Sequence, residues 1–388
     1  MSETTRETVI RCEGVWKIFG DMPRDALDAV LTQRMSKEEI RDRYDCIVGV
    51  RDASFSVARG EIFCIMGLSG SGKSTLIRHI NRLIEPTAGS ILIEGEDVNA
   101  LSARDLRRLR AEKIGMVFQN MALMPHRTVL ENVGFSQEVR GHDLRERNSN
   151  ALRAIEAVDL KGWENKYPDE LSGGMQQRVG LARAIAADPT ILLMDEPFSA
   201  LDPLIRRQLQ EKFMTLSAEM KKTTLFITHD LDEAIRIGDR IAIMKDGALL
   251  QVGSPKEIYE KPESKFAADF IGVMNFLHVK RTADGFATPD GTPIKTQHVS
   301  GDVGEGEAIA AVRPERLSVG EGGDNHFEGV VAEIAYHGLD LLLHVKTDLS
   351  DTPVIARMTA DVADTHQPEI GQRITLSWLA RDTHIFPA

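Results

Sequence analysis

The segment from Gly67 to Ser74, Gly-Leu-Ser-Gly-Ser-Gly-Lys-Ser, constrains the fold of this chain more than any other stretch. It matches the phosphate-binding loop pattern G-x-x-x-x-G-K-[ST] at every fixed position. Residues 61–66 before it form an apolar run of strand length, and residues 75–80 after it have helical spacing of apolar residues. A glycine-rich turn that matches by chance is the alternative. The flanking strand and helix favour a P-loop α/β core.

The residue types of this loop explain the chemistry that we expect. Glycines let the backbone turn its N–H groups inward at a helix N-terminus, which creates an anion-binding nest. Lys73 can then reach the β- and γ-phosphates of a nucleotide, and Ser74 can offer its hydroxyl to Mg²⁺. The expected phosphate-binding residues are Gly67, Ser69, Gly70, Ser71, Gly72, Lys73, Ser74 and Thr75.

Length and charge limit the remaining possibilities. A chain of 388 residues is too long for one ordinary domain. Its net charge of −12 argues against nucleic acid as the main partner. The first eight residues lack the apolar core of a signal peptide, and no apolar run is long enough to span a bilayer. Any membrane role would therefore depend on a partner chain.

The pattern up to about residue 255 alternates between strands and helices. Residues 21–47 interrupt it after a first strand at 9–19, and a capping box at 36–39 marks a helical insertion. Residues 120–187 have mainly helical spacing. Buried-type strands are expected at 114–118, 190–194 and 223–228, as in a mostly parallel sheet.

The pattern changes near residue 275, where long helical periods end. Short alternating stretches follow, punctuated by glycine and aspartate, and they predict a small all-β barrel of oligonucleotide/oligosaccharide-binding (OB) type. The expected strands are 308–312, 327–336, 341–346, 354–358 and 373–379. We therefore expect one domain at 1–275 and a second at 276–388.

Two acids follow the apolar strand that begins at Ile191. Asp195 is placed to hold Mg²⁺ through water, and Glu196 to polarise a water that attacks the γ-phosphate. Solvated acids at a strand end are the ordinary alternative. Gln119 and His229 also follow strands, so the amide could contact Mg²⁺ and water, and the imidazole could bond the γ-phosphate. Each of these two, taken alone, could equally be structural.

A second serine–glycine turn, Ser172-Gly173-Gly174, precedes another helix. It predicts a second phosphate-facing helix N-terminus, with a plain N-cap as the alternative. One nucleotide has no use for two such cradles from one chain. We therefore expect this turn to complete the site of a second copy, with the nucleotide held between two subunits.

Together these segments resemble the nucleotide-binding subunit of ATP-binding cassette (ABC) transporters. Walker A (67–74), the Q-loop glutamine (119), the LSGG signature (171–174), Walker B (191–196), the D-loop (199–202) and the switch histidine (229) match in order. By this resemblance Glu196, His229 and Gln119 are catalytic, Ser74, Gln119 and Asp195 bind Mg²⁺, and Asp202 belongs to the nucleotide site. Phe19 would stack on adenine, with Trp16 as its rival, and Met175 departs from the commoner glutamine.

The resemblance implies a P-loop NTPase with a RecA-like core, a helical subdomain and ATP and Mg²⁺ as ligands. It also implies a homodimer at the cytoplasmic face of the inner membrane, a transmembrane permease and a periplasmic or extracellular solute-binding protein. The segment 119–133 would meet the permease, since the Q-loop joins the site to a segment rich in exposed-type apolar residues, Met121, Leu123 and Met124. A core role for the methionines is the alternative.

Several phrases resemble the quaternary-amine branch, which imports glycine betaine, choline, proline betaine or trimethylamine N-oxide. They are the insertion 21–47 and the segments 81–86, 118–126, 167–175 and 199–205. Residues 276–388 instead resemble the transport-associated OB barrel of sugar, polyamine and iron importers, most clearly at 311–315. An importer of those solutes is thus one alternative, and a soluble regulatory or DNA-repair ABC ATPase is another.

Overall fold

The computed structural model describes residues 7–338, 340–359 and 368–388. The prediction that the first eight residues form no signal peptide therefore lies largely outside the described residues. The chain divides into two compact units, one ending at Pro255 and one beginning at Lys256. The change of sequence pattern predicts this division later, at 275/276. Residues 256–275 belong with the strands because the Arg313 guanidinium donates to the carbonyl oxygens of Gly272 and Val273, at 3.0 and 3.2 Å.

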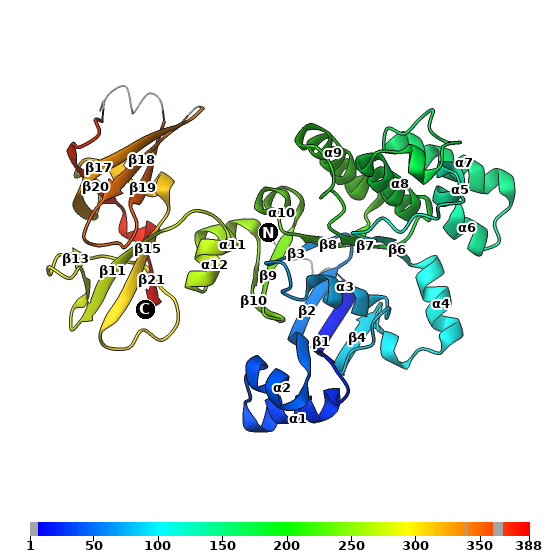
Figure 1. Cartoon of the computed structure of the whole chain (residues 1–388), viewed down its shortest axis with the longest axis horizontal. Helices are drawn as coiled ribbons and strands as arrows, with labels where there is room; N and C mark the ends of the chain where they lie inside the picture. Colours follow the sequence, from blue (N-terminus) through cyan, green and yellow to red (C-terminus); the bar gives the residue numbers. More distant parts are fainter. Residues whose placement is uncertain (1–6, 339, 360–367) are drawn as a thin grey trace. The chain divides into compact units, whose positions relative to one another are not determined.

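The first unit is built on a six-stranded sheet of order β10-β9-β3-β8-β7-β6 (Figure 1). All neighbouring strands pair parallel except β10 with β9. Every residue of β3, β7 and β8 is buried, because other elements cover both faces of the sheet. On one face Phe55 of an antiparallel sheet stacks on Phe63 of β3. The strands are β3 Ile62–Met66, β6 Ile114–Val117, β7 Ile191–Asp195, β8 Thr223–Thr228, β9 Arg240–Lys245 and β10 Ala248–Gly253.

A second, antiparallel sheet of order β2-β1-β4-β5 carries the predicted insertion. Two helices lie between β1 and β2 in the sequence. The predicted capping box is present: the Ser36 hydroxyl accepts a hydrogen bond from the Glu39 N–H, and the Glu39 carboxylate accepts one from the Ser36 N–H. The helices are α1 Pro23–Gln33 and α2 Lys37–Tyr44. The strands are β1 Thr8–Phe19, β2 Ile47–Ala58, β4 Ala88–Ile93 and β5 Glu96–Asp97.

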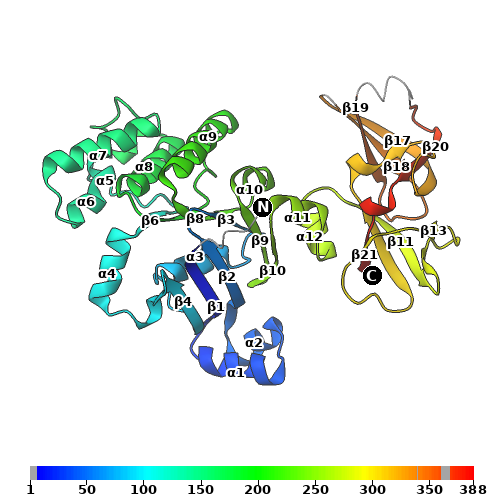
Figure 2. The ribbon, with the colours of Figure 1, turned by 180° about the vertical axis from the view of Figure 1, so that it is seen from behind.

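The helices of the first unit follow the predicted order. Those between β6 and β7 gather beside that edge of the sheet, as both views show (Figures 1 and 2). Among the residues that the structure describes, no helix combines the length and apolarity needed to cross a bilayer. The helices are α3 Lys73–Ile80, α4 Ala103–Glu112, α5 Val129–Val133, α6 Phe135–Val139, α7 Leu144–Ala157, α8 Gly173–Ala186, α9 Pro203–Met220 and α10 Leu231–Ile237.

The second unit opens with two short helices, α11 Pro255–Glu260 and α12 Lys265–Phe270. Its later described residues form strands and two short 3₁₀ helices, Pro314–Arg316 and Ala380–Asp382. Its sheets have the orders β13-β12-β11-β15-β21-β14 and β16-β20-β17-β18-β19. Apolar side chains of both sheets form one core, which includes Leu277, Phe327 and Trp378. The strands are β11 Asn275–Thr282, β12 Gly285–Ala287, β13 Pro293–Ile294, β14 His298–Val299, β15 Glu307–Val312, β16 Ser318–Val319, β17 Asn325–His337, β18 Asp340–Lys346, β19 Val354–Thr359, β20 Arg373–Trp378 and β21 His384–Pro387.

Candidate functional site

The phosphate loop needs its glycines for two separate reasons. Gly70 and Gly72 have φ angles of 78° and 102°, in the left-handed region that glycine adopts without penalty. A Cβ on Gly72 would lie 2.2 Å from the carbonyl oxygen of Gly49, and a Cβ on Gly67 would lie 2.2 Å from that of Met244. The loop is therefore closely packed against its neighbours and leads directly into α3.

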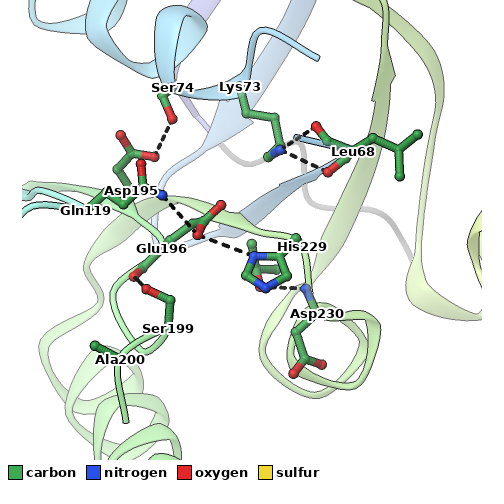
Figure 3. A network of polar contacts seen from close by, with 12 residues as sticks. Leu68, Lys73, Ser74, Gln119, Asp195, Glu196, Ser199, Ala200, His229 and Asp230 are labelled. Atoms are coloured by element: carbon green, nitrogen blue, oxygen red, sulfur yellow. Dashed lines mark hydrogen bonds and ion pairs between the residues drawn. The ribbon is translucent and has the colours of Figure 1, made fainter. Parts of the chain in front are cut away.

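Lys73 is held above this loop. Its side chain is nearly buried, and Nζ donates to the carbonyl oxygens of Gly67 and Leu68, each at 2.9 Å (Figure 3). Burial lowers the pKa of the ammonium, although the carboxylates of Glu196 and Asp195 oppose this effect. Both acceptors are neutral, so an anionic phosphate would be a stronger partner for this cation.

Asp195 ends β7 with a fully buried side chain. Its Oδ1 accepts a hydrogen bond of 2.8 Å from the Ser74 hydroxyl, and its Oδ2 lies 3.5 Å from Nη2 of Arg78. Burial raises the pKa of the carboxyl, and the bond from Ser74 and the charge of Arg78 act against it. A hydroxyl and a carboxylate side by side are hard oxygen donors, so this pair fits Mg²⁺.

Glu196 lies where three strand ends converge. One of its carboxylate oxygens, Oε2, is 3.3 Å from Nε2 of Gln119 and 3.3 Å from Nδ1 of His229 (Figure 3). The three residues follow β7, β6 and β8, whose carboxyl ends share one edge of the parallel sheet. A carboxylate held by two polar side chains beside a phosphate loop is suited to orient and deprotonate a water molecule.

The signature turn and the D-loop acid make local bonds at the starts of two helices. The Ser172 hydroxyl accepts from the Met175 N–H at 3.3 Å and caps α8, while Ser172 and Gly173 are exposed. Asp202 caps α9 in the same way, accepting from the Ile205 N–H at 3.1 Å. Within one chain these residues are N-caps, so a nucleotide role for them remains a prediction.

The two candidates for an adenine-stacking residue have different surroundings. Phe19 ends β1 with 39% of its surface exposed, whereas Trp16 is only 7% exposed. Trp16 packs in a cluster with Leu27 and Val30 of the insertion helix α1. Phe19 is therefore the more accessible of the two rings, with Nζ of Lys17 lying 5.0 Å from its centroid, and its role in stacking on adenine stays a prediction.

The apolar residues expected to meet a permease are intermediate in exposure. Met121, Leu123 and Met124 are each partly buried, so they are neither a fully exposed surface nor a core. The backbone of the segment 121–124 includes two non-glycine residues with positive φ, Met121 at 33° and Ala122 at 47°. This segment therefore depends on contacts from elsewhere for its shape.

Sequence reasoning missed three residues of the site. Arg78 lies one helical turn after Ser74 and so reaches the same carboxylate, a spacing that could have indicated it. Gln177 and Arg183 both lie on α8. Gln177 donates to the carbonyl oxygen of Glu196, and Arg183 donates to that of Met121 in the Q-loop segment. Their spacing carries no such signal, because their partners are distant in the sequence.

Comparison with known proteins identifies the family of this chain. The family described as "ABC transporter" matches residues 50–199, and the "TOBE domain" matches residues 310–386. The glycine betaine/proline betaine transport system ATP-binding protein ProV of Escherichia coli is 50% identical over 288 residues, which cover 74% of this chain and 72% of that protein. This chain belongs to the ABC transporter ATP-binding proteins.

Other relatives of this ABC protein carry similar names. The glycine betaine transport ATP-binding protein OpuAA of Bacillus subtilis is 53% identical over 70% of the chain, and the chain spans 65% of that relative's length. The trimethylamine N-oxide transport system ATP-binding protein TmoW of Ruegeria pomeroyi is 50% identical over 74% of the chain and 85% of that protein.

Solved structures support the fold. The structure described as the dimeric structure of MJ0796, a bacterial ABC transporter cassette, is 33% identical, with a TM-score of 0.55. It covers 63% of this chain and 98% of the cassette. A second structure is described as the same cassette in a post-hydrolysis state bound to ADP and Pi. The predicted P-loop cassette and OB-like C-terminal domain are thereby confirmed.

Proposed function

We propose that this ABC protein hydrolyses ATP to drive an importer of a quaternary or methylated amine. The observation that carries the proposal is the convergence of Lys73, Ser74, Asp195 and Glu196 at the carboxyl edge of one parallel sheet. These groups supply a phosphate cradle, a metal site and a general base within one network.

The side chains of the site then divide the tasks of hydrolysis among them. The loop N–H groups and Lys73 bind the β- and γ-phosphates, and Phe19 stacks on the adenine. Ser74 and Asp195, with Gln119 nearby, would hold Mg²⁺, which neutralises charge on those phosphates when bound. Glu196 accepts a proton from the attacking water, while Gln119 and His229 keep its carboxylate aimed at that water.

We further propose that two copies share each nucleotide. The signature turn Ser172-Gly173-Gly174 of one copy would close on the γ-phosphate held by Lys73 of the other, with Asp202 at the interface. The exposed hydroxyl of Ser172 at the start of α8 supports this arrangement, because a helix N-terminus favours anions. The relative MJ0796 is described as a dimeric cassette.

The transported solute is inferred from relatives. ATP-binding proteins named for glycine betaine, proline betaine, choline, carnitine and trimethylamine N-oxide transport are 44 to 53% identical to this chain. The TOBE match favours polyamine, sugar or iron import as the second candidate. In either case a transmembrane permease and a solute-binding protein would complete the system, and this subunit would lie at the cytoplasmic face of the membrane.

Two experiments test the proposal at separate levels. The purified full chain should release phosphate from ATP with Mg²⁺ and stop when EDTA removes the metal. Cells in which the gene is deleted should lose uptake of radiolabelled glycine betaine, choline or trimethylamine N-oxide. The wild-type gene should restore uptake, and a Glu196→Gln gene should not. Unchanged uptake of all three amines would contradict the solute class but not the ATPase.

A further inference from the structure

One buried amide of α8 contacts the backbone of the catalytic glutamate. Gln177 is 1% exposed, and its Nε2 donates to the carbonyl oxygen of Glu196 at 3.2 Å. Its Oε1 accepts from the Ala200 N–H at 3.0 Å. The amide therefore joins both ends of the turn that follows β7, which also contains Ser199 (Figure 3).

The backbone of this turn needs such support. Glu196 has a φ of 51°, in the left-handed region that side-chain-bearing residues rarely adopt. This angle sets the direction in which the carboxylate leaves the chain toward Gln119 and His229. A conformation of this kind persists only where surrounding contacts hold it, and Gln177 supplies two of them.

A second side chain of α8 holds the Q-loop. The Arg183 guanidinium donates from Nη1 to the carbonyl oxygen of Ala122 at 2.7 Å and from Nη2 to that of Met121 at 2.8 Å. These are the two residues with positive φ that follow Gln119. One planar guanidinium bonded to two successive carbonyl oxygens restricts both peptide units at once.

We propose that Gln177 and Arg183 are positioning residues through which α8 keeps Glu196 and Gln119 in the geometry that hydrolysis requires. α8 begins at the signature turn, which would contact the nucleotide bound by the partner subunit. The same helix would therefore also position Glu196 and Gln119 beside the nucleotide bound by its own subunit. This inference rests on the proposed ATPase function and adds to it a connection within one subunit.

The first test compares two buried glutamines. Gln177→Met removes both hydrogen bonds to the turn at similar volume, and Gln137→Met is the matched control. Gln137 on α6 is 3% exposed and donates to a carbonyl oxygen at the other end of α8, Ala186, at 2.6 Å. Gln177→Met should lower kcat by about 10²-fold with KM for ATP within about twofold, since small misplacements of catalytic groups have effects of this size.

Gln137→Met should change kcat by less than about twofold while losing comparable thermal stability. Equal falls in kcat for the two variants would overturn the proposal, because the effect would then follow stability alone. If Gln177→Met does not fold, Gln177→Glu replaces it. That variant keeps the acceptor for the Ala200 N–H and loses the donor to Glu196, so an unchanged kcat would also overturn the proposal.

The second test is a double-mutant cycle. Arg183→Lys keeps the charge but loses the planar pair of donors, and should lower kcat by about tenfold in the wild-type chain. In a Gln119→Ala background it should have almost no further effect, because the group that it positions is absent. A tenfold fall in both backgrounds would assign Arg183 a structural role only. Absence of hydrolysis in the wild-type chain would refute the proposed function before any variant is compared.

Discussion

Two helix N-termini of this ABC protein have similar sequences and different surroundings. The N-terminus of α3 follows Gly-Ser-Gly and is completed by Lys73, Ser74 and Asp195 from the same chain. α8 follows Leu171-Ser172 and begins with Gly173-Gly174, and the exposed Ser172 caps its own helix. Both can attract an anion, but only the first has the cation and metal-binding oxygens for a nucleotide.

The difference indicates that the α8 end is half of a site. A serine–glycine turn contributes N–H groups and a hydroxyl. These groups can add hydrogen bonds to a nucleotide whose phosphates are already bound by a cation and a metal on another surface. If a second copy supplies that surface, closure of the dimer and completion of the catalytic site are the same event. Substitutions can therefore change one end and leave the other intact.

The largest effect is expected from Glu196→Gln at the α3 side. This variant should lower kcat by about 10³-fold, because the general base is lost, while every phosphate-binding group remains. ATP should therefore accumulate in a closed dimer, which size-exclusion chromatography with ATP and Mg²⁺ would detect. Hydrolysis at the wild-type rate would remove Glu196 from the mechanism.

Next is Ser172→Arg at the α8 end. Its bulk and charge should block ATP-driven dimerisation and lower hydrolysis by about 10²-fold, while the Kd of one chain for ATP stays within about threefold. Ser102→Arg is the matched control, since Ser102 is also an exposed N-cap serine, on α4. If dimers of the Ser172 variant persist with ATP, the shared-site account is wrong.

Asp195→Asn tests the metal half of the α3 end. The amide can still accept from the Ser74 hydroxyl, but it lacks the charge that fits Mg²⁺, so kcat should fall by about 30-fold. The Mg²⁺ concentration for half-maximal hydrolysis should rise in a titration at fixed ATP. An unchanged Mg²⁺ dependence would show that the carboxylate does not serve the metal.

The smallest effect is expected for Phe19→Ala. Loss of base stacking should weaken ATP binding by about tenfold and leave kcat at saturating ATP almost unchanged. Trp16→Ala should instead lower thermal stability, because that ring is buried against α1. The reverse pattern, with ATP binding lost only in the Trp16 variant, would exchange the two roles.

The α3 end could be predicted from the sequence because its signals are local. The glycine loop, the apolar strands and the acids after them lie within short segments, and the parallel sheet places their ends together. Gln177 and Arg183 could not be identified, because their bonds to Glu196, Met121 and Ala122 depend on how α8 packs against distant loops.

The second unit shows the same limit. Five alternating stretches predicted β15, β17, β18, β19 and β20. The strands β12, β13, β14 and β16 have only two or three residues each, too few for a periodic pattern. The longer strands β11 and β21 were not predicted either. The second unit begins at Lys256, before the predicted residue 276, because Arg313 bonds to Gly272 and Val273, some 40 positions earlier in the chain. A local sequence pattern cannot reveal contacts between residues so far apart.

A cryo-EM structure of the Glu196→Gln protein with ATP and Mg²⁺ tests the central claim most directly. We predict a dimer in which the Ser172 hydroxyl of each protomer lies within hydrogen-bonding distance of a γ-phosphate bound by Lys73 of the other. An ATP-loaded structure in which Ser172 is remote from every γ-phosphate, in either protomer, would contradict the account.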